Sequence, residues 1–285
     1  MIKYEWITEL SESEADELAD LLSRAAAYDA ESGYTTIDFA DVRRSLVTED
    51  SPDRHLLIWM LPRATAMDSP EAPECIAGLL RLEGAASGRA EATAVIDPTL
   101  RSIGIMTLLL EQVGLDASDA AGWLGSGAHT ITSWARGNHP ASGRLSNRFL
   151  IARTRRVWQL VRGLESDSDL AVPVLEPSGS TESGARYTLR EMGRIVGSAT
   201  LSRRPVFTDE IGDCAVIAEI DAPPSAPPGA LRRLLEGAVA VAGEAGLCGA
   251  IVHVDSDEVG LVNAARLAGF YHNRTDVRYQ IGGRS

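Results

Sequence analysis

The stretch of this sequence best suited to chemistry is a strand, a tight turn and a helix start between Glu91 and Glu111. Residues up to Ile96 favour an extended backbone, and Asp97-Pro98 ends the strand. Gly104 then precedes the apolar run Leu108–Leu110, which indicates a helix. The first N–H groups of a helix have no partner within it, so they attract an anion such as a phosphate. An ordinary strand-to-helix connection ending in glycine has the same pattern, so the motif alone leaves both interpretations open.

The composition is that of a soluble globular protein. Its 285 residues are enough for one large or two ordinary domains, and two is the better expectation. The formal net charge of −13 argues against nucleic acid or an anionic membrane as a partner, because both bind clustered positive charge. The chain has no apolar run long enough to span a membrane, and Met1–Trp6 lacks the apolar core of a signal peptide. We therefore expect a cytoplasmic protein, either a monomer or a homodimer.

The residue types that bind metals are not arranged as a metal site. Cys75, Cys214 and Cys248 are widely spaced and form no CxxC pair, which is typical of buried thiols in a reducing compartment. Asp255 and Asp257 have the spacing of loop ligands for a hard cation, but capping of the following helix explains them better. No metal is expected.

Hydrophobic periodicity predicts a mixed α/β (α+β) order of elements in the first half. A strand is followed by two helices, three strands, a helix, a strand, a helix and a terminal strand pair. The predicted ranges are a strand at 2–7, helices from Ser11 or Ser13 and over 38–46, strands at 55–61, 76–83 and 91–96, a helix after Gly104, a strand at 130–134, a helix at 138–149 and the pair around 154–161.

This order resembles that of the GNAT-type acyl-CoA N-acyltransferases. The hexad Arg101–Met106 is similar to the family's (Gln/Arg)-x-x-Gly-x-(Gly/Ala), with Met106 where the family has a small residue. Further runs resemble the tandem-domain mycothiol synthase family within the GNATs, over about the first 160 residues. These runs are His55–Leu57, Ile76–Gly78, Ala90–Glu91 and Trp134–Gly137.

The resemblance implies two tandem GNAT-like domains, each a mixed, mostly antiparallel sheet flanked by helices. Domain 1 would span 1–164, and its turn would hold the diphosphate of acetyl-CoA through backbone amides. The implied coenzyme-binding residues are Ile96, Arg101, Ser102, Ile103, Gly104, Ile105 and Met106. A catalytic GNAT domain usually has a tyrosine in the helix after the fifth strand, but there is none between Asn138 and Leu150.

The second half repeats part of the first. Polar, turn-rich residues predict a linker at 165–184, and domain 2 would follow at 185–285 without the first two helices. Its phosphate turn would use Gly229 and Ala230, although Pro227-Pro228 removes two N–H donors.

In the mycothiol synthase family the general base lies on the strand before the phosphate turn of the second domain. The carboxylates on that strand here are Asp213 and Glu219, and strict alternation places both on one face. Either could accept a proton from an ammonium group. A solvent-exposed acid with no catalytic role is the competing interpretation of each residue.

Two functions remain open. The first is an acetyl-CoA-dependent N-acetyltransferase acting on a primary amine of a small molecule, in the family a cysteinyl-glucosaminyl-inositol. The second is a catalytically degenerate tandem GNAT protein that serves as an acyl-CoA-binding or protein-interaction module. The proline-containing turn and the missing tyrosine favour the second, and family resemblance favours the first.

Overall fold

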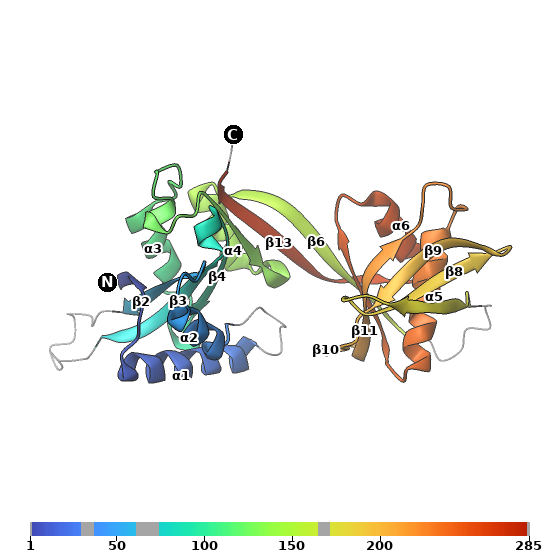
Figure 1. Ribbon diagram of the computed structural model, residues 1–285, viewed down its shortest axis with the longest axis horizontal. Coiled ribbons are helices and arrows are strands. Elements are labelled where there is room, and N and C mark those ends of the chain that lie inside the picture. Colours follow the sequence, from blue (N-terminus) through green and yellow to red (C-terminus); the bar gives the residue numbers. More distant parts are fainter. Residues whose placement is uncertain (1, 30–36, 61–73, 165–171, 284–285) are drawn as a thin grey trace. The chain divides into compact units, whose positions relative to one another are not determined.

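The computed structural model describes residues 2–29, 37–60, 74–164 and 172–283, and the chain forms two compact units (Figure 1). Unit 1 comprises the residues up to Thr154 together with those from Val277 onward, and unit 2 comprises Arg155–Asp276. The chain enters unit 2 along strand β6 (Ala152–Gly163) and leaves it along strand β13 (Tyr271–Gly282).

Unit 1 contains a sheet with the strand order β1-β2-β3-β4-β5-β13. The strands pair antiparallel except β4 with β5, which is parallel. The elements are β1 Ile2–Ile7, α1 Glu12–Asp29, α2 Phe39–Val47, β2 Arg54–Met60, β3 Cys75–Glu83, β4 Arg89–Ile96, α3 Ile105–Val113, β5 Thr130–Ala135 and α4 Pro140–Phe149.

Local sequence sets the ends of the first two helices. The Ser11 N–H and hydroxyl donate to Glu14 at 2.9 and 2.7 Å, and the Glu14 N–H donates to the Ser11 hydroxyl, which is a capping box at the start of α1. The Asp38 carboxylate accepts the Ala40 N–H at the start of α2. The predicted helix starts are therefore confirmed.

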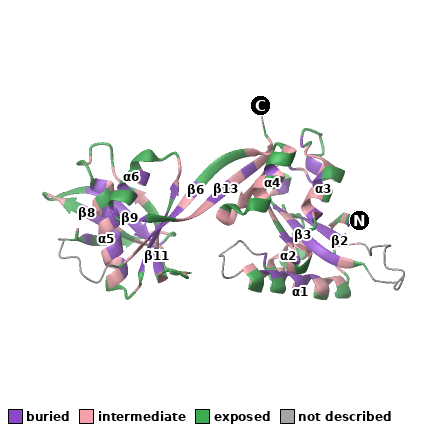
Figure 2. Ribbon diagram, turned by 180° about the vertical axis from the view of Figure 1, so that it is seen from behind, coloured by how far each residue is buried: buried purple, intermediate pink, exposed green. Residues whose placement is uncertain are grey.

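The strands of unit 1 bury both faces. On one face, α1 and α2 cover alternate residues of β2 to β4, such as Leu57, Leu79 and Val95. On the other, α3 covers the intervening residues, such as Leu56 and Leu80. Figure 2 shows this burial along β2 and β3. The near-continuous apolar runs of these strands reflect a sheet with helices on both sides.

Unit 2 has a sheet of the order β6-β12-β11-β9-β8-β7, with β10 paired to β11. Both of its described helices, α5 and α6, pack on one face of this sheet. The opposite face holds a small apolar cluster of Val161, Cys214 and Ile251. The elements are β7 Leu175–Ser180, β8 Ala185–Glu191, β9 Arg194–Leu201, β10 Val206–Thr208, β11 Gly212–Asp221, α5 Ala230–Glu244, β12 Gly249–Asp255 and α6 Val259–Leu267.

The last strand of each half pairs in the sheet of the other half. Strand β6 runs antiparallel to β12 from Val157↔Asp255 to Gly163↔Gly249. Strand β13 runs antiparallel to β5 from Val277↔Ala135 to Gly282↔Thr130. The predicted terminal strand pair around 154–161 is therefore wrong, because these residues form the single strand β6. The predicted domains, 1–164 and 185–285, follow the sequence repeat. The compact units differ from them, because most of β6 belongs to unit 2 and the end of β13, from Val277, belongs to unit 1.

Part of the predicted linker is a strand. Residues 176–180 belong to β7, which pairs with β8 and lies at the edge of the sheet. An edge strand tolerates Pro177, and the register shift between Pro177 and Gly179 accommodates it. Residues 165–171 of the predicted linker lie outside the described residues. No helix in the described part of the chain is long and apolar enough to cross a membrane.

Candidate functional site

Strands β4 and β5 pair over only a short length. Their parallel register runs from Arg89↔Thr130 to Glu91↔Thr132, while β4 continues along β3 as far as Ile96. The two strands therefore part after Glu91 and Thr132, and we call this divergence the unit 1 fork. About 16 Å of β4 lies beyond it.

The backbone of β4 presents unpaired groups to the unit 1 fork. The Asp97 N–H donates to the Ala77 carbonyl at 2.9 Å, so the backbone groups of every second residue from Asp97 backward face β3. The N–H and carbonyl groups of Ala92, Ala94 and Ile96 therefore face the side from which β5 has diverged. The Ile96 carbonyl already accepts Arg101 Nε, and the Glu91↔Thr132 pairing with β5 uses the Ala92 N–H. The Ala92 carbonyl, both backbone groups of Ala94 and the Ile96 N–H remain available to an extended ligand that takes the place of a strand.

The turn after β4 forms an anion site of backbone amides, which we call the Gly104 corner (residues 97–107). Asp97 accepts the Thr99 N–H at 2.9 Å and so fixes the turn. Ser102 and Gly104 adopt left-handed conformations with φ of 66° and 93°, and α3 begins directly afterwards. Within the described residues, no acceptor binds the N–H groups of 102–107, and a Cβ on Gly104 would meet nothing within 4 Å. These amides and the helix dipole together favour a phosphate.

The side chains of the predicted hexad play different parts. Ile105 and Met106 pack into the core beneath α3, while Ser102 and Ile103 are exposed. Met106 therefore lies below the corner rather than in front of its amides. The hexad would therefore bind a ligand through its backbone N–H groups and not through its side chains.

The guanidinium of Arg101 is bound within the protein. It donates to both carboxylate oxygens of Asp29 at 2.7 and 2.8 Å, and its Nε donates to the Ile96 carbonyl at 3.1 Å. It also lies 5.1 Å from the centre of the Tyr28 ring. The hydrogen bond to Asp29 raises the pKa of Arg101 further. Arg101 thus ties the end of α1 to the Gly104 corner.

The corresponding turn in unit 2 has fewer donors. Pro227 and Pro228 have no N–H, and the Ala230 N–H donates to the Pro227 carbonyl at 3.1 Å. Gly229 has a φ of 80°, but a Cβ there would lie 3.1 Å from Nη1 of Arg233. Of the two predicted phosphate turns, the one in unit 1 is the more open.

Unit 2 also has a fork, and it separates the two predicted catalytic carboxylates. Strand β11 pairs with β12 only from Cys214 to Ile217, and a bulge against β9 follows before Glu219. Because the bulge adds one residue, Glu219 shares a face with Thr200, while Asp213 shares the opposite face with Ala215. The prediction that both lie on one face is wrong.

Their surroundings differ as well. Glu219 accepts hydrogen bonds from the hydroxyls of Ser183 at 2.8 Å and Thr200 at 3.2 Å, at the point where β11 and β12 part. Asp213 is exposed at the start of β11, and its backbone carbonyl accepts the Cys248 N–H. Only Glu219 lies at a fork.

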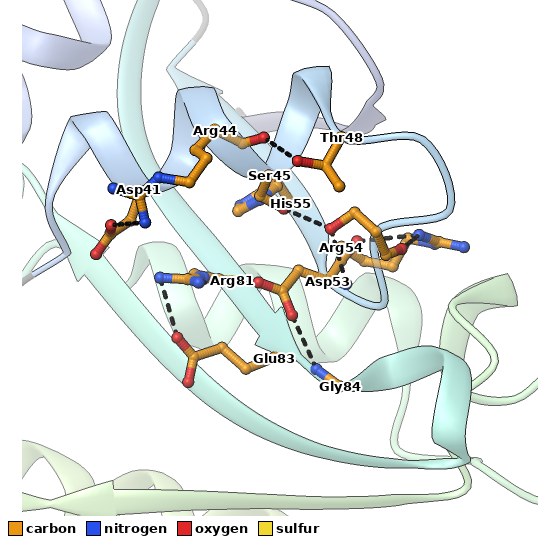
Figure 3. A network of polar contacts seen from close by, with 11 residues as sticks. Asp41, Arg44, Ser45, Thr48, Asp53, Arg54, His55, Arg81, Glu83 and Gly84 are labelled. Atoms are coloured by element: carbon orange, nitrogen blue, oxygen red, sulfur yellow. Dashed lines mark hydrogen bonds and ion pairs between the residues drawn. The ribbon is translucent and has the colours of Figure 1, made fainter.

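A polar network ties α2 to β2 and β3 in unit 1 (Figure 3). Nε2 of the buried His55 lies 3.1 Å from the Ser45 hydroxyl. Arg81 bridges Asp53 at 2.8 Å and Glu83 at 3.0 Å, and the Gly84 N–H also donates to Asp53. These last charges are satisfied by one another, so the network stabilises the fold rather than offering free groups to a ligand.

A cavity of about 390 Å³ adjoins the unit 1 fork. Glu91 and Thr132, the last pair before the strands part, both line it, together with Arg278 of β13. Sequence reasoning missed Arg278, because only the pairing of β13 with β5 brings it to this place. Among the described residues, no group of three or more His, Cys, Asp or Glu side chains could hold a metal ion.

The fold of this chain is similar to that of known acetyltransferase structures. A GCN5-related N-acetyltransferase from Sphaerobacter thermophilus superposes with a TM-score of 0.56 at 15% identity, covering 99% of this chain and 96% of that one. A tandem GNAT protein from the clavulanic acid biosynthesis pathway superposes with a TM-score of 0.58 at 13% identity, over the full length of both chains. The chain has a tandem GNAT fold. At these identities the structural likeness establishes the fold alone.

The sequence of this tandem GNAT chain is similar to two mycothiol acetyltransferases. The one from Frankia alni is 31% identical over 178 residues, 62% of this chain and 49% of that protein. The one from Sanguibacter keddieii is 27% identical over 139 residues, 49% of this chain and 38% of that protein. The chain thus spans half or less of the length of these relatives. No protein-family model matches it.

Proposed function

We propose that this chain is an acetyl-CoA-dependent N-acetyltransferase that acts on a primary amine of a small molecule. The observation that carries the proposal is the Gly104 corner, where no acceptor in the described part of the chain binds the N–H groups of 102–107 and Gly104 faces open space. The diphosphate of the coenzyme would bind there. Its pantetheine arm would run back along β4 and pair with the free backbone groups of Ala94 and the free N–H of Ile96, as a strand would.

This placement puts the thioester at the unit 1 fork. A free N–H of β4 would stabilise the oxyanion that forms when the amine attacks the thioester carbon. Glu91 lies at the fork and would take a proton from the substrate ammonium. The leaving thiolate would then be protonated as the tetrahedral intermediate collapses.

The predicted bases Asp213 and Glu219 belong to unit 2, so they would act only on a coenzyme bound there through Gly229 and Ala230. Glu219 is the better placed of the two, because it lies at the unit 2 fork. The scarcity of donors at the turn around Gly229 favours a second role for unit 2, a degenerate GNAT module without turnover. The likeness to mycothiol acetyltransferases makes a cysteinyl-glucosaminyl-inositol an acceptor to assay.

Thermal unfolding with and without acetyl-CoA tests the proposal. A hundredfold excess over Kd should stabilise the protein by about 2.7 kcal/mol and raise its melting temperature. Gly104→Val should abolish this rise, since the new side chain would stand where the diphosphate binds. Gly114→Val is the matched control, because Gly114 ends the same helix with a φ of 69° and equally open space.

Thiol release from acetyl-CoA in the presence of amines then separates enzyme from binding module. Release that depends on both the amine and Glu91 supports catalysis in unit 1. A thermal shift without release would leave an acyl-CoA-binding module. The absence of any shift, or a shift that survives Gly104→Val but not Gly229→Val, would refute the assignment of the site to unit 1.

A further inference from the structure

The fork cavity is lined by polar side chains from three adjacent strands of unit 1. Strand pairing places Glu91 beside Thr132, and Thr132 beside Gln280, so that alternate residues of β4, β5 and β13 share one face. Val95 of β4 lies on this same face, and α1 and α2 cover it. The polar lining residues that share the cavity are Arg89, Glu91, Thr130, Thr132, Arg278 and Gln280.

The charges in this cavity are not neutralised by the protein. Within the described residues, the side chains of Arg89, Glu91 and Arg278 form no ion pair and no hydrogen bond. The Nε of Arg278 is buried without an acceptor. The terminal nitrogens of Arg278 also have no acceptor within the described residues, and they are not buried. Because an unpaired donor is most costly at a charged group, a ligand in the cavity that supplies acceptors to these nitrogens explains the arrangement best.

Other arginines of the chain show that Arg278 is a distinct case. Arg81 and Arg162 also have a buried Nε without an acceptor. Their terminal nitrogens, however, donate to Asp53 at 2.8 Å and to the Ala268 carbonyl at 2.5 Å. In the part of the chain that the structure describes, the terminal nitrogens of Arg278 have no such acceptor, and Arg278 lines the cavity that adjoins the fork.

We propose that the fork cavity binds the acetyl acceptor, and that this acceptor is a small amine that also carries an anionic group. The inference rests on the proposed function and narrows its substrate class. Two guanidinium groups, Arg89 and Arg278, would bind the anion, and Glu91 would bind the ammonium. The volume of about 390 Å³ suits a molecule of metabolite size.

The acetyl transfer needs only Glu91 and the two substrates to move its protons. The ammonium gives one proton to Glu91, and the resulting amine forms a C–N bond to the thioester carbon. The C–S bond then breaks, and the second proton of the nitrogen passes to the leaving thiolate. In the product an uncharged amide replaces the ammonium, and the anionic group is unchanged. It no longer presents an ammonium to Glu91, which favours its release.

The test compares three amines of similar size in the thiol-release assay at saturating acetyl-CoA. Beta-alanine carries a carboxylate, phosphoethanolamine a phosphate, and ethanolamine no anion. The kcat/KM of at least one anionic amine should exceed that of ethanolamine by about 10- to 100-fold. The better of the two anionic amines identifies the anion.

Variants assign the preference to the cavity. Arg278→Met should lower the ratio of anionic to neutral kcat/KM by about tenfold or more, mainly through KM. Arg89→Met is the second variant, should the first fold poorly. Arg144→Met is the matched control, because Arg144 is an exposed arginine of α4 outside the cavity, and it should leave the ratio unchanged.

The outcomes separate the two proposals. Thiol release with no preference for an anionic amine, or a preference that survives both cavity variants, overturns this inference and leaves the N-acetyltransferase standing. If acetyl-CoA binds without turnover, an amine-induced rise in melting temperature that Arg278→Met removes supports the site, and its absence overturns it. If acetyl-CoA does not bind, the proposed function fails and the inference fails with it.

Discussion

The buried histidine of unit 1 should make the protein sensitive to mild acid. His55 lies on β2 with 1% of its surface exposed, and its Nδ1 has no hydrogen-bond partner within the described residues (Figure 3). Burial, followed by the nearby charge of Arg81, lowers the pKa of His55 from 6.5 to about 4. The imidazole is therefore neutral at pH 7 in the folded protein.

The sign of the effect follows from proton uptake. Between pH 6.5 and pH 4 the unfolded chain binds a proton at His55 and the folded chain does not, so folding becomes less favourable as pH falls. At about 1.36 kcal/mol per pKa unit, the full loss is about 3 kcal/mol and is reached below pH 4. Between pH 7.5 and pH 5 the loss should be about 2 kcal/mol.

The pH range over which His55 lowers the stability differs from the range over which Asp53 does so. Burial alone would raise the pKa of Asp53, but the hydrogen bonds from Arg81 and Gly84 outweigh it and lower the pKa below 3.8. The stability that Asp53 contributes is therefore lost only as the pH falls below about 3.8. Measurements at pH 7.5 and pH 5 leave its contribution intact.

Urea unfolding followed by tryptophan fluorescence measures the effect. Four of the five tryptophans belong to unit 1, so the signal reports mainly on the unit that contains His55. The free energy of unfolding that is lost between pH 7.5 and pH 5 should be about 2 kcal/mol smaller in His55→Gln, because glutamine does not titrate. In Ser45→Ala, which keeps the histidine, the loss should persist. An equal loss in the wild type and His55→Gln would refute the reasoning.

Other changes act on the Gly104 corner, on a crowded glycine and on the proline-containing turn. Asp29→Asn frees Arg101, so it should lower the free energy of unfolding by about 1 kcal/mol and weaken the acetyl-CoA-induced thermal shift; an undiminished shift would contradict a positioning role for the pair. Gly184→Ala should lower the melting temperature far more than Gly179→Ala, because its Cβ would lie 1.9 Å from a backbone oxygen of β9, whereas Gly179 faces open space; equal effects would contradict this. Calorimetry should find one acetyl-CoA per chain, and replacing Pro227–Pro228 by alanines should add a second, weaker site; two sites in the wild type would contradict the assignment to unit 1.

Local patterns predicted most of the elements because their causes are local. The helix start at Ser11 depends on a residue three positions away. Gly104 likewise needed only its own neighbours to be recognised as the start of α3. Such features are visible in a single sequence.

The errors arise where a residue's partner is distant in the chain. Nothing in the alternation of β6 specifies that it pairs with β12, because strand pairing has no local signature. The bulge before Glu219 is equally invisible, and it reverses the face on which that carboxylate lies. Arg278 reaches the fork cavity through pairing alone.

The two units share a fold but differ at the turn where each was predicted to bind a phosphate. Both have a glycine in a left-handed conformation before a helix, and both have parallel strands that part after a few residues. Those features depend on apolar spacing and on one glycine each. An anion site depends instead on free N–H groups, and Pro227 and Pro228 remove two of these without disturbing α5. The retained fork and glycine in unit 2 therefore indicate common architecture, whereas the free amides beside Gly104 indicate where a coenzyme would bind.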